Sequence, residues 1–245
     1  MDVSPRSYLV PTVILALGIA LGGAFMGRGF RMAREADRYV TVKGAVEREV
    51  EANLALWPLQ LVTGANDLGA AQAEARRRVD LTRSFLSDNG IAAEQVTVQG
   101  FKVMDTATNP YQSGPSPSRF IITQTLMVRS EDPQAVLAAS QKVGDLVDAG
   151  VVLISGEEYG PGGPTFLFTK LNDLKPAMLA EATTRARESA DQFASSSGSS
   201  VGGIRRANQG VFEILPRDPV PGQSEQNQLY KVIRVVATIE YLLEG

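Results

Sequence analysis

An apolar segment near the amino terminus constrains this chain more than any other feature of its sequence. Leu9 to Met26 are eighteen consecutive residues without a charged side chain. At about 1.5 Å of rise per residue, a helix of this length is at the lower end of what spans a bilayer core. A cleaved signal peptide is the alternative, with a weak cleavage candidate near Ala20-Leu21-Gly22, but the apolar stretch is long and Asp2 accompanies Arg6 before it. We therefore expect residues 1–27 to be an uncleaved transmembrane anchor and residues 28–38 to be a charged linker.

Four glycines in this segment form two G-x-x-x-G pairs, Gly18 with Gly22 and Gly23 with Gly27. Such spacing lets the backbones of two membrane helices approach closely and associate. Glycine is also common in ordinary membrane spans, so a span without an association face is the alternative. The pairs predict membrane helix association and favour a homo-oligomer.

The arginines around the segment bear on its orientation. Arg28, Arg31, Arg34 and Arg38 follow it, whereas Arg6 and the amino terminus precede it. Positive-inside counting would place the large domain in the cytoplasm, although long domains translocate largely regardless of charge. The residues alone leave the side of the membrane open.

The remaining residues, 39–245, predict one α+β domain in which helices cover an antiparallel sheet in two layers. Apolar residues at helical spacing predict helices over 67–89, 132–150 and 173–198. The first has Asn66 or Asp67 as its cap and Gly90 as its stop, and the second starts at Asp132-Pro133. The positions at helical spacing in the first are Leu68, Ala71, Ala75, Val79, Thr82 and Leu86.

Alternating and β-branched runs predict strands. Pro58 predicts an edge or a bulge in the strand that contains it, because proline cannot donate to a sheet ladder. A strand, a helix and a pair of strands with a long loop occur twice, which suggests an internal pseudo-repeat. The predicted strands cover 40–50, 54–62, 95–104, 119–129, 151–157, 165–168, 204–215 and 230–243.

Two long polar loops, NPYQSGPSPS and PRDPVPGQSEQNQ, separate the strands of the two pairs. Loops of this length are either disordered or binding elements. Their candidate interaction residues are Tyr111 and Pro115 in the first loop, and Pro219 and Tyr230 in or beside the second. Trp57 and Phe166 are further aromatic candidates, for which packing in the core is the default interpretation.

Two residue types are missing, and their absence excludes familiar chemistry. The chain has no cysteine and no histidine, which removes thiolate chemistry, Ser-His-Asp triads and HExxH sites. Gly198 to Gly202 match G-x-S-x-G but follow a helix, so we expect a turn rather than a nucleophile elbow. The net charge of −3 disfavours binding to nucleic acid. The run Arg76-Arg77-Arg78 lies in a predicted helix, and we expect it to form a solvated face of that helix. We expect no catalytic residues, no cofactor and no metal site.

Four stretches of the chain resemble the SIMPL-domain proteins of bacteria, and in particular the subset with an uncleaved N-terminal anchor. The resemblance covers nearly the whole chain from about residue 40. The stretches are VTVKGAVEREVEANLALWPL at 40–59, FLFTKLNDLKPAMLAEAT at 166–183, ARESADQFA at 186–194 and IRRANQGVFEI at 204–214.

The resemblance implies a periplasmic α+β domain tethered to the inner membrane, with no established catalytic residues. A secreted periplasmic relative, an immunogenic protein, assembles into a ring- or channel-like homo-oligomer. Members of the family are loosely associated with envelope or oxidative stress. This chain differs from that relative in its anchor and its loops.

Three functions follow from these observations, in decreasing order of support. The first is a non-enzymatic, membrane-anchored protein of the cell envelope that forms homo-oligomers. The second is a binding module for a small ligand, a peptide or an envelope polymer. The third is an enzyme that uses carboxylates or lysine, which would require a deep pocket holding a buried carboxylate pair or a lysine of shifted pKa.

Overall fold

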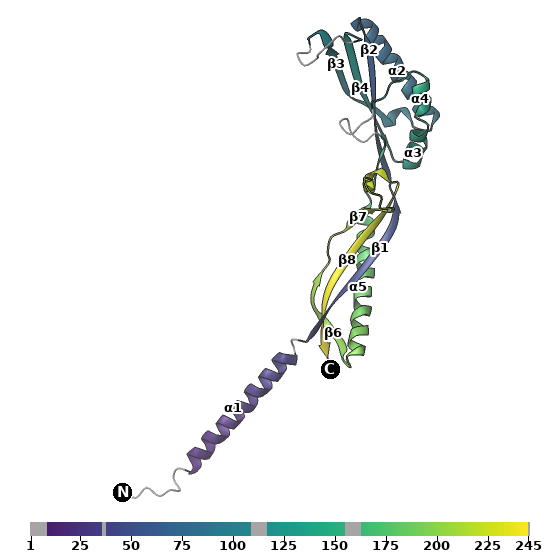
Figure 1. Cartoon of the computed structure of the whole chain (residues 1–245). Helices are drawn as coiled ribbons and strands as arrows, with labels where there is room; N and C mark the ends of the chain where they lie inside the picture. Colours follow the sequence, from purple (N-terminus) through teal and green to yellow (C-terminus); the bar gives the residue numbers. More distant parts are fainter. Residues whose placement is uncertain (1–8, 36–37, 109–116, 155–162, 245) are drawn as a thin grey trace. The chain divides into compact units, whose positions relative to one another are not determined.

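A computed structural model describes residues 9–35, 38–108, 117–154 and 163–244 of the chain (Figure 1). It contains both helices and strands, and several strands follow one another directly along the chain. The helices are α1 (Leu9–Glu35), α2 (Leu68–Asp88), α3 (Pro133–Gln141), α4 (Gly144–Asp148) and α5 (Leu171–Ser196), with short 3₁₀ turns η2 (Ala93–Gln95), η3 (Thr106–Thr108) and η5 (Glu225–Asn227). The strands are β1 (Tyr39–Glu51), β2 (Leu54–Ala65), β3 (Val96–Asp105), β4 (Phe120–Ser130), β5 (Thr165–Leu167), β6 (Ser200–Asn208), β7 (Glu213–Pro216) and β8 (Tyr230–Glu244).

The strands form two four-stranded sheets within the described ranges, which confirms the predicted α+β class with antiparallel sheets. The chain divides into two compact units. One unit comprises residues 1–46, 176–212 and 235–245, and the other comprises 47–175 and 213–234. The boundary between the units falls inside β1, α5 and β8, so each of these elements contributes residues to both.

The unit of residues 47–175 and 213–234 contains the sheet of order β3-β4-β2-β5. Helices α2, α3 and α4 cover one face of this sheet (Figure 1). Asp67 caps α2, because its side chain accepts a hydrogen bond from the Ala70 N–H at 2.9 Å. The buried side chains of α2 are the predicted ones at helical spacing, apart from Leu68, which is exposed. Trp57 and Phe166, 3% and 2% exposed, lie in the core as expected.

The other unit contains the sheet of order β1-β8-β6, against which α5 packs (Figure 1). The side of α5 that is buried consists of small residues, since every fourth position is alanine after an initial methionine. This stripe allows β1 to approach the helix closely, and Gly44 of β1 lies directly against the backbone of Ala182. The stripe residues are Met178, Ala182, Ala186, Ala190 and Ala194.

Three predicted elements differ from the structure. The helix expected over 132–150 is broken between Gln141 and Gly144 into α3 and α4, although its Asp132-Pro133 start is confirmed. The strand expected over 204–215 is interrupted at Gly210, whose φ of 72° belongs to the left-handed region, and becomes β6 and β7. The strand expected at 151–157 is reduced, over residues 151–154, to a single bridge between Leu61 and Leu153, and its last three residues lie outside the described ranges.

Helix α1 includes the apolar segment of the sequence. Its side chains are described from Ile14 to Gly29, and all of them are exposed. Across the described ranges, no helix reaches both the length and the apolar character needed to cross a bilayer.

Candidate functional site

The face of the β3-β4-β2 sheet that α2 does not cover carries a mixed polar and apolar surface. Successive side chains of a strand point to opposite faces. In β4, Ile122, Leu126 and Val128 are buried under the helices, while the alternate residues face the other way. We call this second surface the open face. On β4 the open face consists of Ile121, Thr123, Thr125, Met127 and Arg129. The strand register places residues of both neighbouring strands beside them: Leu56, Gln60 and Val62 of β2 on one side, and Thr97, Gly100, Lys102 and Met104 of β3 on the other.

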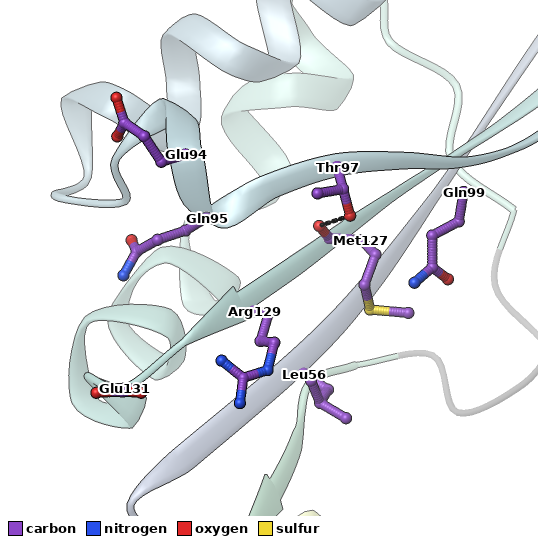
Figure 2. Close-up of a pocket in the computed structure, with 8 residues that line it drawn as sticks. All are labelled: Leu56, Glu94, Gln95, Thr97, Gln99, Met127, Arg129 and Glu131. Carbon is purple, nitrogen blue, oxygen red and sulfur yellow. Dashed lines mark hydrogen bonds between the residues drawn. The ribbon is translucent and has the colours of Figure 1, made fainter.

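One end of the open face holds a cavity of about 440 Å³, here called the Arg129 cavity (Figure 2). Arg129 of β4 and Leu56 of β2 lie directly opposite each other in the strand register. The Thr97 hydroxyl of β3 is turned to the Met127 carbonyl, to which it donates a hydrogen bond at 3.5 Å. Glu94 and Glu131 also line the cavity. Residues of both charge signs therefore line this end of the open face.

The middle of the same face holds a second cavity of about 560 Å³, here called the Lys102 cavity. Lys102 is the one charged residue in its lining. The Gln60 Oε1 atom is buried and has no hydrogen-bond partner within the described part of the chain. The remaining lining is apolar or hydroxylic and comprises Val62, Gly100, Phe101, Met104, Ile121, Thr123, Thr125 and Ile154.

Strand β3 forms the outer edge of this sheet. It pairs with β4 on one side, and no strand of the described residues pairs with it on the other. Three large apolar side chains of β3 are exposed, Val98 by 47%, Phe101 by 55% and Val103 by 44%. A long edge strand with exposed apolar residues is a site at which another chain can add a strand.

The predicted association glycines lie on the exposed part of α1. A Cβ atom built at Gly18, Gly22, Gly23 or Gly27 would meet no other atom within 4 Å. The backbone at both G-x-x-x-G pairs is therefore open to approach by another helix. Their association stays a prediction.

Two of the four predicted loop residues lie within the described ranges. Tyr111 and Pro115 lie outside the described residues. Pro219 is exposed in the loop between β7 and β8, and Tyr230 is half-buried at the start of β8, with the Arg217 guanidinium 4.7 Å from its ring centroid. The Gln228 side chain closes this loop by hydrogen bonds with both the N–H and the carbonyl of Asp218. Pro219 and Tyr230 therefore lie in and beside a single loop that these hydrogen bonds hold closed. Neither residue lines either cavity of the open face.

No group of three or more acidic side chains in the described ranges could hold a metal ion. Gly198 has a φ of 68° after the end of α5, and β6 begins at Ser200, so the G-x-S-x-G match is a helix-to-strand turn as predicted.

Lys231 is 1% exposed, and burial lowers its pKa while the charge of Glu225 opposes that shift. Its ammonium donates to the Glu225 carbonyl, and it lines neither cavity. The buried lysine thus has a structural partner and no pocket.

The basic run on α2 is engaged by an acidic neighbour. Glu74 accepts hydrogen bonds from Arg77 at 2.8 and 2.9 Å and from Arg78 at 2.9 Å. Arg78 also donates to the Val62 carbonyl at 2.5 Å, which ties α2 to β2. These contacts engage two of the three guanidinium groups with one shared carboxylate and agree with a solvated helix face rather than a phosphate site.

Replacing Glu74 by glutamine is expected to flatten the acid dependence of stability. The hydrogen bonds from Arg77 and then Arg78 lower the pKa of Glu74 from 4.5 to about 2. A carboxylate whose pKa is lower in the folded state stabilises the fold above its unfolded pKa, and this contribution is lost as the pH falls through the folded pKa. The wild-type urea midpoint should therefore fall more steeply than that of Glu74→Gln between pH 4.5 and pH 2. Glu188→Gln, at an exposed position, is the control, and equal slopes for all three proteins would contradict the expectation.

The open-face residues were not identified from the sequence. The signal was present in β4, where threonines alternate with large apolar residues, but alternation alone does not say which face is covered. Gln60 and Lys102 are brought beside Thr123 and Thr125 by strand pairing, and that pairing is not visible in a single sequence.

A protein-family model matches most of the chain. The family model described as SIMPL, protein of unknown function (DUF541), matches residues 40–234. No curated protein matches the chain.

Proposed function

The chain belongs to the SIMPL family of proteins of unknown function, and from that premise we propose that it is a membrane-anchored, extracytoplasmic, non-enzymatic protein that assembles with copies of itself. The exposed edge strand β3 is the observation that carries the proposal. The proposed location is the inner membrane, with the folded part in the periplasm. Ring formation and a role in envelope stress are extensions of the same proposal that rest on the family resemblance.

Self-association is supported first by the chemistry of β3. An edge strand presents a row of unpaired N–H and C=O groups, and soluble proteins usually protect such a row with charges, prolines or a covering element. Lys102 is the one basic residue of β3, and the neighbouring Phe101 and Val103 are both exposed. A second copy that adds a strand to β3 would satisfy the backbone groups and bury these side chains.

The anchor is supported by the composition of α1. Its described side chains include seven large apolar residues that no other part of the described chain covers: Ile14, Leu15, Leu17, Ile19, Leu21, Phe25 and Met26. Transfer of such side chains from water to an apolar environment is favourable by about 25 cal/mol per Å². We infer that the surrounding medium of this helix is lipid, and that the open glycine pairs bring several copies together there.

A fractionation experiment tests the anchor and the orientation together. The full-length chain, expressed in a Gram-negative bacterium, should remain in the membrane pellet after alkaline carbonate extraction, because an inserted helix is not released by high pH. Protease added to spheroplasts should digest the folded part, since the proposal places it outside the inner membrane. Deletion of residues 9–26 should abolish membrane retention. Release of the full-length chain by carbonate, or protection from protease in intact spheroplasts, would contradict the anchor or the orientation respectively.

The recurrence of elements supports an internal duplication. In one sheet, β2 is followed by α2, β3 and β4, with β4 in the middle between β2 and β3. In the other sheet, α5 is followed by β6, β7 and β8, and β8 again lies in the middle, between β6 and β1. We infer a pseudo-repeat of the helix and the strands that follow it; β1 takes the place in the sheet that corresponds to β2, although it comes at the start of the folded part of the chain rather than directly before α5.

A further inference from the structure

The Lys102 cavity brings three kinds of recognition group together on one face of the sheet. Thr123 of β4 lies opposite Val62 on one side and Lys102 on the other, and Thr125 lies opposite Gln60 and Gly100. The two rows are adjacent along β4. A cation, an amide and two hydroxyl groups therefore share the floor and rim of one cavity of about 560 Å³, a size within the usual range for small-ligand sites.

Two polar side chains of the cavity, Gln60 and Lys102, lack a partner for hydrogen bonding or charge pairing within the described residues. Within the described residues the Gln60 Oε1 atom is a buried acceptor without a donor, and leaving a buried polar atom unsatisfied is unfavourable. Lys102 is exposed and forms no ion pair with any residue that the structure describes. A ligand that fits the cavity should accordingly offer a hydrogen-bond donor to Gln60 and a negative charge to Lys102.

The apolar lining adds a third requirement. Val62, Ile121, Ile154, Met104 and Phe101 surround the polar groups. Their burial by a ligand would be favourable, whereas a purely polar ion would leave them in contact with water. The ligand should carry an alkyl or aryl group beside its anionic group.

The spacing of the polar groups sets the length of the ligand. Gln60 and Lys102 lie on the two strands that flank β4 and one row apart. With neighbouring strands about 4.8 Å apart and a two-residue step of about 6.8 Å along the strand, their Cα atoms are separated by about 12 Å. An extended peptide covers about 3.3–3.6 Å per residue, so three or four residues span the distance.

From these four observations we propose that the Lys102 cavity binds the carboxyl-terminal end of a short peptide with an apolar last residue. The α-carboxylate pairs with the Lys102 ammonium, a peptide N–H donates to Gln60 Oε1, and the apolar side chain packs among Val62, Ile121 and Ile154. Thr123 and Thr125 supply hydroxyl groups for the remaining peptide polar atoms. Binding at this site does not require membrane insertion, whereas a second copy added to β3 would lie beside Lys102, which belongs to that strand.

Calorimetric titration of the full-length protein in mild detergent tests the site with three probes. The first is acetyl-Ala-Ala-Leu with a free carboxylate, the second is the same peptide with a carboxamide end, and the third is octanoate, which has the charge and the apolar group but no N–H. The free acid should bind, and the carboxamide and octanoate should each bind at least tenfold more weakly.

Variants assign the binding to the proposed groups. Lys102→Gln and Gln60→Leu should each weaken binding of the free acid about tenfold or more. Lys43→Gln, which removes an exposed lysine of β1, is the matched control and should bind as the wild type does. Thermal melting of each variant confirms that it is folded.

Four results would overturn the proposal. They are no binding of the free acid to wild-type protein, equal binding of the acid and the carboxamide, binding of octanoate as tight as that of the peptide, and equal losses in Lys102→Gln and Lys43→Gln. Binding of octanoate in preference to the peptide would identify a fatty-acid site instead.

Discussion

Replacing Gly44 by alanine is expected to destabilise the unit built around α5 by about 3 kcal/mol or more, at the upper end of the cost of overpacking a core. A Cβ atom at this position would lie 1.8 Å from the Ala182 carbonyl oxygen and 2.7 Å from the Ala186 nitrogen. Both are backbone atoms of a helix, so no side-chain rotation can relieve the clash. Strand β1 or helix α5 would have to move apart along the buried alanine stripe.

Urea unfolding monitored by circular dichroism measures the effect of Gly44→Ala. Gly203→Ala is the matched control in the same unit, because a Cβ atom at Gly203 would meet nothing within 4 Å. The control should unfold near the wild-type midpoint, and Gly44→Ala well below it. A Gly44→Ala midpoint equal to that of the control would show that β1 does not approach α5 as closely as described.

Placing two lysines on the exposed edge strand is expected to dissociate the proposed assembly. Val98 and Val103 are about half exposed, so Val98→Lys/Val103→Lys should leave the fold intact. In an assembled edge, however, the same side chains would be buried against a second copy, and unpaired charges there are strongly unfavourable. Most of the assembled material should therefore become monomeric at concentrations at which the wild type is associated.

The matched control carries the same two substitutions away from the edge. Val147 on α4 and Val152 after it are exposed by 57% and 54% and lie outside β3. Val147→Lys/Val152→Lys adds the same charge and should retain the wild-type size. Equal sizes for the two double variants would contradict the role of β3 in assembly.

Local signals in the sequence predicted much of the fold. Asp67, the apolar positions of α2 and Gly90 specified that helix, and the structure confirms the cap, the buried stripe and the positive φ of Gly90. Asp132-Pro133 specified the start of α3 in the same way. Such features depend on residues within a few positions of one another, which a single sequence displays.

Features that depend on contacts between distant segments were not predictable in this way. Proline at position 58 suggested an edge or a bulge, yet β2 pairs with β4 through Pro58 without a register shift, and its pairing with β5 stops at Leu56. The edge interpretation is therefore confirmed at this point, and the bulge interpretation is wrong. The break at Gly210 reflects its close approach to the Val236 carbonyl, a residue of β8 far along the chain. The open face is likewise a product of strand pairing.

The most direct test of the account is the native mass of the full-length protein in mild detergent, compared with that of Val98→Lys/Val103→Lys. We predict that the wild type gives a mass equal to several copies of the chain and that the edge variant gives the mass of one copy. A wild-type particle that is strictly monomeric across the concentration range would contradict the claim that this protein functions as a self-assembling, membrane-tethered scaffold.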